Sequence, residues 1–280
     1  MNKKLLELIS EIGKKIQKDY LPAFSAQAAF FLLLSFFPFV LFLLNLAKYL
    51  PFSQIDVENL IRNVAPYDVS LYMVNLIDEL YNKVTGTLVS LSIITLIWSA
   101  SKGMLAIMNG LNAVYQTLET RRYLPIRVIA TLYTFVVAVM VVVMLTVFVF
   151  GNTIVDGLIK EYSTIEDLMK ILVNIRPIVG IIIILGFFML IYKVLPNHKE
   201  KKKVVFPGAI FSTISWMIFS YMFSMIVDNV ANLSRLYGSL TKIIVVLLWL
   251  YVSMFILFLG AELNYFLREG YLTRFKNVIK

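Results

Sequence analysis

Cysteine is absent from the 280 residues of this chain, and histidine occurs once, as His198. Without cysteine the protein has no disulfide, no thiol nucleophile and no thiolate ligand for a metal. A hydrolytic metal site needs several histidine or carboxylate ligands, and none are grouped around His198. A glycine-rich phosphate loop of the Walker type is absent as well. We therefore expect no metal, no cofactor and no enzymatic activity, and we expect His198 to be a solvated loop residue.

Charge is also scarce. Charged residues make up 15% of the chain and hydrophobic residues 60%, whereas soluble domains have about 25% and about 45–50%. A soluble domain of this size cannot bury so much apolar surface, and a disordered chain would be far more polar. The composition therefore predicts a protein whose surroundings are largely lipid.

Six apolar stretches are long enough to cross a membrane, since a helix needs about 20 residues to span about 30 Å of hydrocarbon. They lie near 24–46, 87–108, 128–150, 177–195, 204–227 and 243–266. The predicted fold is an all-α membrane bundle of six transmembrane helices. Because no low-complexity linker divides the chain, we expect a single domain over residues 1–280.

The basic residues are distributed unevenly between the two sides of these spans. If the N-terminus is cytoplasmic, 17 of the 26 Lys and Arg residues fall on the inner side and 8 on the outer side, with Lys102 inside a span. Short cytoplasmic segments are usually enriched in Lys and Arg. This pattern predicts that both termini are cytoplasmic and accounts for much of the net charge of +9.

Two segments outside the spans have apolar residues at helical spacing. Residues 1–20 alternate Leu and Ile with Lys, as in a helix lying in the interface of an anionic membrane; a helix capping the bundle is the alternative. The outer connection over 50–86 contains a second such pattern, at Leu71, Val74, Ile77 and Tyr81. The 151–176 connection is acidic and is a candidate for a short helix.

Several short strings at the span ends occur in a recognisable order. They are SAQAAF (25–30), LSFFP (34–38), WSASKG (98–103), LNAVY (111–115), YKVLPN (192–197), PGA (207–209), YGS (237–239), WLY (249–251) and GAELN (260–264). Together they resemble the YihY/virulence factor BrkB family of bacterial inner-membrane proteins, some formerly named ribonuclease BN. The resemblance implies six helices and an inner-membrane location. Family members have been linked to serum resistance or to lipid movement, and the resemblance implies no catalytic residues.

Two ionisable residues lie within predicted spans, where each costs about 2.5–3.5 kcal/mol on insertion scales. Lys102 and Glu262 are both expected near the cytoplasmic boundary. They form either an interhelical ion pair or a shared headgroup site. The alternative is that Lys102 snorkels and Glu262 lies in interfacial water.

The second span also has a small-residue stripe, which includes Gly103 and Gly110 and permits close helix packing. An adjacent face carries Lys102, Asn109 and Asn112. This face is a candidate lining for a cavity, or else its asparagines hydrogen-bond neighbouring helices. In the last span, Gly260 belongs to a similar packing face.

Pro38 lies inside the first span, where it removes a backbone donor. It predicts a kink or a break. A broken helix with polar flanks is a substrate site in some transporters, and a static kink is the alternative.

Two functions fit these features. The first is a transporter or translocation factor for a lipid or other amphipathic substrate, handled by Lys102, Asn109, Asn112 and Glu262. The second is a non-transporting scaffold for envelope integrity or for a partner complex. We expect membrane lipids as partners, with anionic headgroups at the basic cytoplasmic face. An envelope protein and a second copy of the chain are further candidate partners, and nucleic acid is not expected.

Overall fold

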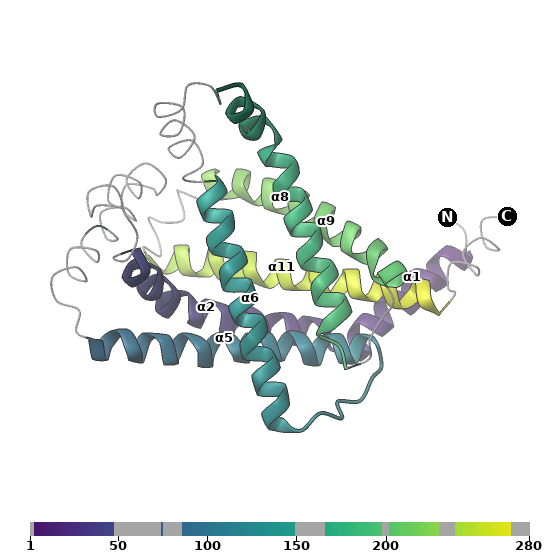
Figure 1. Ribbon diagram of the computed structural model, residues 1–280. Coiled ribbons are helices and arrows are strands. Elements are labelled where there is room, and N and C mark those ends of the chain that lie inside the picture. The colour runs from purple at the N-terminus through teal and green to yellow at the C-terminus, as the bar shows by residue number, and fades with distance from the viewer. Residues whose placement is uncertain are drawn as a thin grey trace.

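The computed structural model of the chain describes residues 3–47, 74, 86–148, 166–197, 202–229 and 239–269. Over these residues every regular element is a helix (Figure 1), which confirms the all-α class for this part of the chain. The helices are α1 (Lys3–Lys18), α2 (Leu21–Ala47), α5 (Gly86–Val114), α6 (Tyr123–Phe148), α8 (Glu166–Val194), α9 (Lys202–Asn229) and α11 (Ser239–Arg268).

Each of the six predicted spans overlaps one of the six long helices from α2 to α11. The largest differences are at α8, which begins at Glu166 and not near 177, and at α5, which ends at Val114 and not near 108. Three stretches are long and apolar enough over the described residues to cross a membrane: 175–194, 204–226 and 243–268. Shorter apolar helices cover 21–35 and 123–137. Because α8 begins at Glu166, the last part of the expected 151–176 connection belongs to this long helix and not to a separate short one. Residues 50–73, 75–85 and 151–165 lie outside the described ranges.

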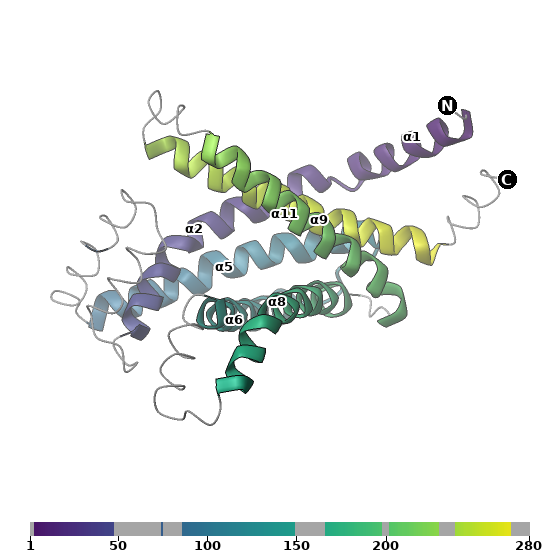
Figure 2. The ribbon, with the colours of Figure 1, turned by 90° about the horizontal axis from the view of Figure 1, so that it is seen from above.

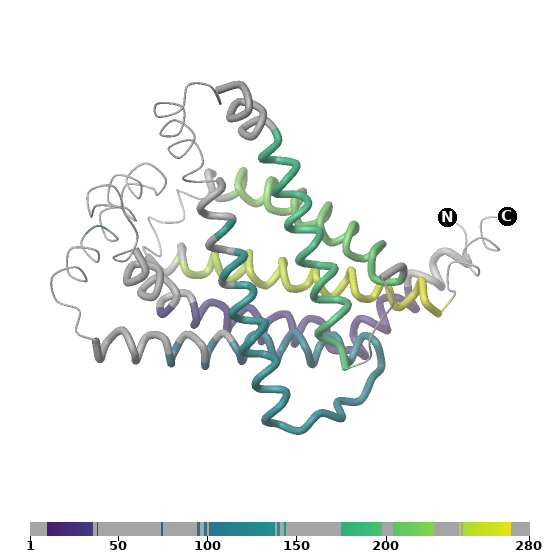
Figure 3. The backbone as a smooth tube through the Cα atoms, viewed as in Figure 1, coloured from purple at the N-terminus to yellow at the C-terminus, as the bar shows by residue number. Residues whose placement is uncertain are grey.

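Helices α2, α5 and α11 form the centre of the bundle (Figures 1 and 2), and each packs against the other two. Outside this centre, α6 packs on α5, while α9 packs on both α8 and α11. The tube in Figure 3 shows how α5 turns through residues 115–122 into α6, which then crosses the face of the bundle. Helix α2 continues through Pro38 to Ala47, so Pro38 does not end the helix. In the turn before Pro38, the Ser35 hydroxyl donates to the Leu32 carbonyl at 2.7 Å.

Helices α9 and α11 make their closest approach at two glycines, Gly208 and Gly260. A Cβ atom added at Gly208 would lie 2.1 Å from the Gly260 carbonyl oxygen, and one at Gly260 would lie 2.0 Å from the Ser212 hydroxyl. Asn264 fixes the register, because its side-chain oxygen accepts the Gly208 amide at 2.7 Å while its amide donates to the Val205 carbonyl at 3.3 Å. Small residues are typical of such contacts in lipid, where no hydrophobic effect drives helices together.

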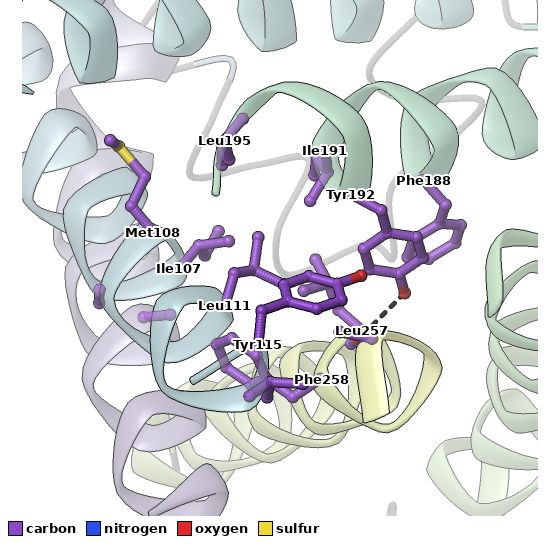
Figure 4. Close-up of a cluster of buried hydrophobic side chains, with 14 of the residues drawn as sticks. Ile107, Met108, Leu111, Tyr115, Phe188, Ile191, Tyr192, Leu195, Leu257 and Phe258 are labelled. Atoms are coloured by element: carbon purple, nitrogen blue, oxygen red, sulfur yellow. Dashed lines mark hydrogen bonds between the residues drawn. The ribbon is translucent and has the colours of Figure 1, made fainter. Parts of the chain in front are cut away.

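A buried hydroxyl pair joins α8 to the same crossing. The Tyr192 hydroxyl of α8 lies 2.7 Å from the Ser212 hydroxyl of α9 and donates to the Leu257 carbonyl of α11 at 2.7 Å. Figure 4 shows the bond from Tyr192 to the Leu257 carbonyl within a cluster of buried apolar side chains that includes Leu111 and Phe258. Both tyrosine and serine are fully buried, so these bonds remove the penalty of placing two hydroxyls in an apolar core.

The end of α5 is held by a C-capping turn and by its own asparagine. Gln116 has a left-handed backbone (φ 52°), and the Thr117 amide returns to the Asn112 carbonyl at 2.9 Å; this is a Schellman-type cap. The Asn112 side chain donates to Glu119 at 2.8 Å and accepts the backbone amide of Asn197 at 2.8 Å. The connection after α5 is therefore tied to the connection after α8.

Glu119 and Arg121 complete this network. Arg121 donates from Nε and Nη2 to the two carboxylate oxygens of Glu119 at 2.8 and 2.7 Å, and also to the Leu195 carbonyl at 3.2 Å. The Arg121 guanidinium holds the pKa of the Glu119 carboxyl below its usual range, with a smaller contribution from the Asn112 amide.

The close contact between α9 and α11 predicts that adding a methyl group at Gly208 or Gly260 destabilises the protein. Gly208→Ala or Gly260→Ala should lower stability in detergent by about 1–3 kcal/mol, because the added Cβ forces backbones apart. Thermal unfolding measured by tryptophan fluorescence tests this. Gly186 in α8 is a matched control, since a Cβ there meets nothing within 4 Å. Gly186→Ala should leave stability unchanged or raise it by about 0.5–1 kcal/mol, and equal losses in all three variants would contradict the account.

The Glu119–Arg121 pair predicts a pH-dependent contribution to stability. Because the pKa of Glu119 is lower in the folded than in the unfolded chain, its ionised form stabilises the fold above the ordinary pKa of 4.5, and this contribution disappears as the pH falls below it. The difference in thermal midpoint between wild type and Glu119→Gln should be present near neutral pH and shrink below about pH 4. Glu11→Gln, an exposed change on α1, is the control. A Glu119→Gln difference that persists at acid pH would refute the assignment.

Candidate functional site

Lys102 lies near the middle of α5 and points along an aromatic face. Its Nζ atom is 3.8 Å from the centroid of the Trp98 ring and 5.2 Å from that of Phe31 on α2. Trp98 is 52% exposed and Lys102 is half-buried. A helical side chain leans toward the N-terminal end of its helix, and the position over Trp98 follows this rule. The ammonium group therefore lies one turn closer to the start of α5 than its own Cα atom.

The length of α5 changes the expected depth of Lys102. The helix continues to Val114 instead of ending near 108, so Lys102 is twelve residues, or about 18 Å, from its end. Glu262 instead lies beside that end, because Lys15 contacts both Glu262 and the Val114 carbonyl. The expectation that Lys102 and Glu262 form an ion pair is wrong. Glu262 pairs with Lys15, and Lys102 contacts rings.

Lys102 belongs to an outward-facing stripe of α5. Ile94, Trp98 and Asn109 follow the same face at helical spacing and are all exposed. On α2, next to Phe31, the side chains of Phe30 (50%) and Leu34 (44%) are also exposed. We call the set Phe30, Leu34, Ile94, Trp98, Lys102 and Asn109 the α2–α5 face. It combines one cation and one amide with a broad apolar and aromatic surface.

Asn112 does not join the α2–α5 face. It is buried, and its amide and carbonyl oxygen are both occupied by the connections after α5 and α8. Asn112 was a candidate either for lining a cavity or for hydrogen-bonding neighbouring segments. Its contacts fit the hydrogen-bonding role.

The glycines at the predicted packing positions lie where other helices come close. A Cβ at Gly103 would be 3.4 Å from Leu32 of α2, and one at Gly110 would be 2.4 Å from Phe258 of α11. These contacts place α5 against both central neighbours, while Gly260 lies at the α9–α11 crossing. Lys102 lies on the adjacent face of the helix, toward the outside of the bundle.

A second polar centre lies at the end of the bundle and includes Glu262. The Lys15 ammonium of α1 contacts the Asp19 carboxylate, lies 2.9 Å from Glu262 Oε2 and donates to the Val114 carbonyl at 3.2 Å. It also lies 4.1 Å from the centroid of the Tyr265 ring. Asp19 and Glu262 are 6% and 2% exposed. We call Lys15, Asp19 and Glu262 the buried charge cluster.

The buried charge cluster decides how α1 meets the bundle. Ile16 packs on the hydrophobic core and Lys15 inserts between α5 and α11, while Figure 2 shows the start of α1 directed away from the other helices. Of the two predicted roles for this segment, an interfacial helix or a helix that caps the bundle, the last turns of α1 fit the second. Sequence reasoning missed Lys15 and Asp19. The available signal was the i, i+4 spacing of Lys15 and Asp19, a pair of opposite charges at the end of the helix.

Arg127 is a further residue that the sequence did not single out. It projects from α6 to α5, where its guanidinium donates to the Ser101 hydroxyl at 3.1 Å. A second cation thus lies beside the residue that precedes Lys102.

The described ranges contain no candidate metal site, because no three His, Asp or Glu side chains are grouped there. His198 lies outside those ranges, as do the lysines at 199 and 201. The predictions for this basic loop therefore stay predictions.

Comparison with known proteins identifies the family. The family model described as "Virulence factor BrkB" matches residues 12–278. The ribonuclease-like protein YfkH of Bacillus subtilis (strain 168) is 37% identical over 246 residues, which cover 88% of this chain and 89% of YfkH.

More distant relatives carry a membrane-protein name. A UPF0761 membrane protein of Tolumonas auensis is 23% identical over 93% of this chain and 85% of its own length. Another UPF0761 membrane protein, from Alteromonas mediterranea, is 23% identical over 95% of this chain and 90% of its own length. No solved structure matches the chain. The family match over nearly the whole sequence, together with the apolar helices, shows that this chain is a membrane protein of the virulence factor BrkB family.

Proposed function

We propose that α2, α5, α6, α8, α9 and α11 cross the bacterial inner membrane, with both termini in the cytoplasm. Hydrogen bonds and ion pairs join the ends that the positive-inside rule assigns to one side. They link the end of α1 to α5 and α11, the end of α5 to the connection after α8, and the first two turns of α9 to α11. Six spans threaded alternately from a cytoplasmic N-terminus bring these ends together.

Within this topology we propose that the protein is a transporter or translocation factor for a lipid or other amphipathic substrate. The observation that supports this most directly is Lys102, a cation near the middle of a 29-residue apolar helix. A charge at that depth costs about 2.5–3.5 kcal/mol, and attraction to Trp98 recovers about 0.5–2 kcal/mol. Lys102 has no carboxylate partner among the described residues. A transient anionic ligand would offset the remaining cost.

The α2–α5 face suits a substrate with a charged head and an apolar body. Lys102 would contact a phosphate or carboxylate of the headgroup, and Asn109, two turns closer to the cytoplasmic end, would donate to it during passage. Phe30, Leu34 and Ile94 would contact the acyl chains. Glu262 and Asn112 are buried away from this face and have no place in the proposed headgroup site.

A non-transporting scaffold is the rival. It would use the same exposed face to bind an envelope protein or a second copy of the chain, and Lys102 would then meet an acidic residue of that partner. A ribonuclease role is disfavoured, since the chain has one histidine and no cysteine. The transport assay below separates the two main functions.

Transport is tested by reconstituting the purified protein in liposomes with fluorescent lipids of anionic or zwitterionic headgroup. Lipid reaching the outer leaflet is bleached by dithionite. We expect the wild type to move the anionic lipid faster, and Lys102→Ala to lower that rate at least tenfold, because one lost charge-assisted contact is worth about 1.5–3 kcal/mol. Lys102→Arg should keep most of the rate.

Lys18→Ala is the matched control, because Lys18 is an exposed lysine outside the α2–α5 face; it should behave as wild type. Insertion and folding of each variant are checked by size-exclusion chromatography. Equal rates in wild type, Lys102→Ala and protein-free liposomes would overturn the transport proposal and favour the scaffold.

A further inference from the structure

The buried charge cluster contains more negative than positive charge. Asp19 and Glu262 both contact the single ammonium of Lys15 and therefore lie beside one another. With both carboxylates ionised, the cluster has a net charge of −1. An uncompensated charge among buried side chains is costly. One additional positive charge would make the cluster neutral.

Glu262 provides a second and independent sign of a missing ligand. Its side chain is 3% exposed, and its Oε1 atom is buried without a hydrogen-bond partner in the described part of the protein. Buried acceptors are almost always satisfied, so an orphan carboxylate oxygen needs an explanation. Protonation of Glu262 supplies one, since it removes the charge and turns the carboxyl into a donor.

The other ionisable groups that the structure describes near Glu262 lie against aromatic rings or on neighbouring residues. From its own helix, Tyr265 faces Lys15, and Arg268 lies with its guanidinium 5.3 Å from the Tyr265 ring and 5.9 Å from the Tyr115 ring of α5. Arg268 also pairs with Glu269 at 3.2 Å. Helix α2 has no titratable side chain along Leu21–Ala47. Over the described residues, the charged groups shown beside the Glu262 carboxyl are Lys15 of α1 and Asp19, which directly follows α1.

A proton fits this place better than a metal cation. A bound cation such as Ca²⁺ takes six to eight oxygen ligands, whereas the Val114 carbonyl already accepts from Lys15, whose ammonium lies 2.9 Å from Glu262 Oε2. A metal ion there would meet this ammonium at close range. A proton needs no coordination shell.

We propose that Glu262 is a reversible proton-binding site, with Asp19 and Lys15 as its supporting pair, and that the bound proton is the coupling ion for transport. On binding, the carboxylate takes up one proton and becomes a neutral carboxyl, while Lys15 stays paired with Asp19, so the net charge changes from −1 to 0. Release restores the carboxylate. The coupling part of this proposal rests on the proposed transport function, whereas the proton site does not.

The site is tested by infrared difference spectroscopy of the full-length protein in lipid, titrated from about pH 5 to pH 9. We expect the stretching band of a protonated carboxyl to appear at the acid end and disappear at the alkaline end. The band should shift when the protein is labelled with ¹³C-glutamate, which needs no mutation. It should be missing in Glu262→Gln and retained in Glu269→Gln, an exposed control one residue from Arg268.

Coupling is tested in the same liposomes with an imposed gradient of one pH unit. Coupling of one proton per lipid should shift the ratio of labelled lipid between the leaflets by up to about tenfold, because 1.4 kcal/mol corresponds to a factor of ten. A pH-dependent glutamate band without any lipid movement would leave the proton site standing and remove the transport function. Lipid movement that ignores the gradient, with no such band, would overturn the proton site and leave transport standing. A band that persists unchanged in a folded Glu262→Gln variant would refute the assignment to Glu262.

Discussion

The close approach of α9 and α11 at Gly208 and Gly260 is the contact on which the rest of the bundle depends. In lipid, apolar side chains gain nothing by leaving their surroundings, so helices associate through close fit and hydrogen bonds. The two glycines provide the fit, and Asn264 provides a bond to the Gly208 amide. Tyr192 then fastens α8 to the same place through Ser212 and Leu257. The outer face of α11 is thus occupied, which leaves its inner face for α2 and α5.

This packing has consequences for both polar centres. Phe258 of α11 lies against Gly110 of α5, so the small-residue stripe of α5 faces inward and Lys102 faces outward. The ends of α5 and α11 then lie side by side, and the gap between them is occupied by Lys15 of α1. On the α2–α5 face a single cation lies among exposed apolar and aromatic side chains. In the buried charge cluster three ionisable side chains contact one another away from solvent.

Much of the fold could be predicted from the sequence, because each long apolar run is by itself a strong signal for a helix of membrane length. The small stripe through Gly103 and Gly110 also indicated a packing face, and these glycines lie at helix contacts. The partners of the charged residues could not be predicted. The position of Lys102 depended on where α5 ends, and its end at Val114 is set by a cap at Gln116 and not by hydropathy. The partner of Glu262 is Lys15 of α1. The i, i+4 spacing of Lys15 and Asp19 indicates that these two residues pair, but not that Lys15 contacts α11. Asn112 appeared to belong with Lys102 on one face of α5, but the connection after the helix folds back and occupies it.

The central claim is that Lys102 holds an anionic headgroup in the middle of the membrane. The most direct measurement is an electron cryo-microscopy structure of the protein in native-lipid discs, with a bound antibody fragment to add mass. The account predicts elongated density along the α2–α5 face, with its head within hydrogen-bonding distance of the Lys102 ammonium. An α2–α5 face covered by a second copy or another protein, with Lys102 paired to an acidic residue there, would contradict it.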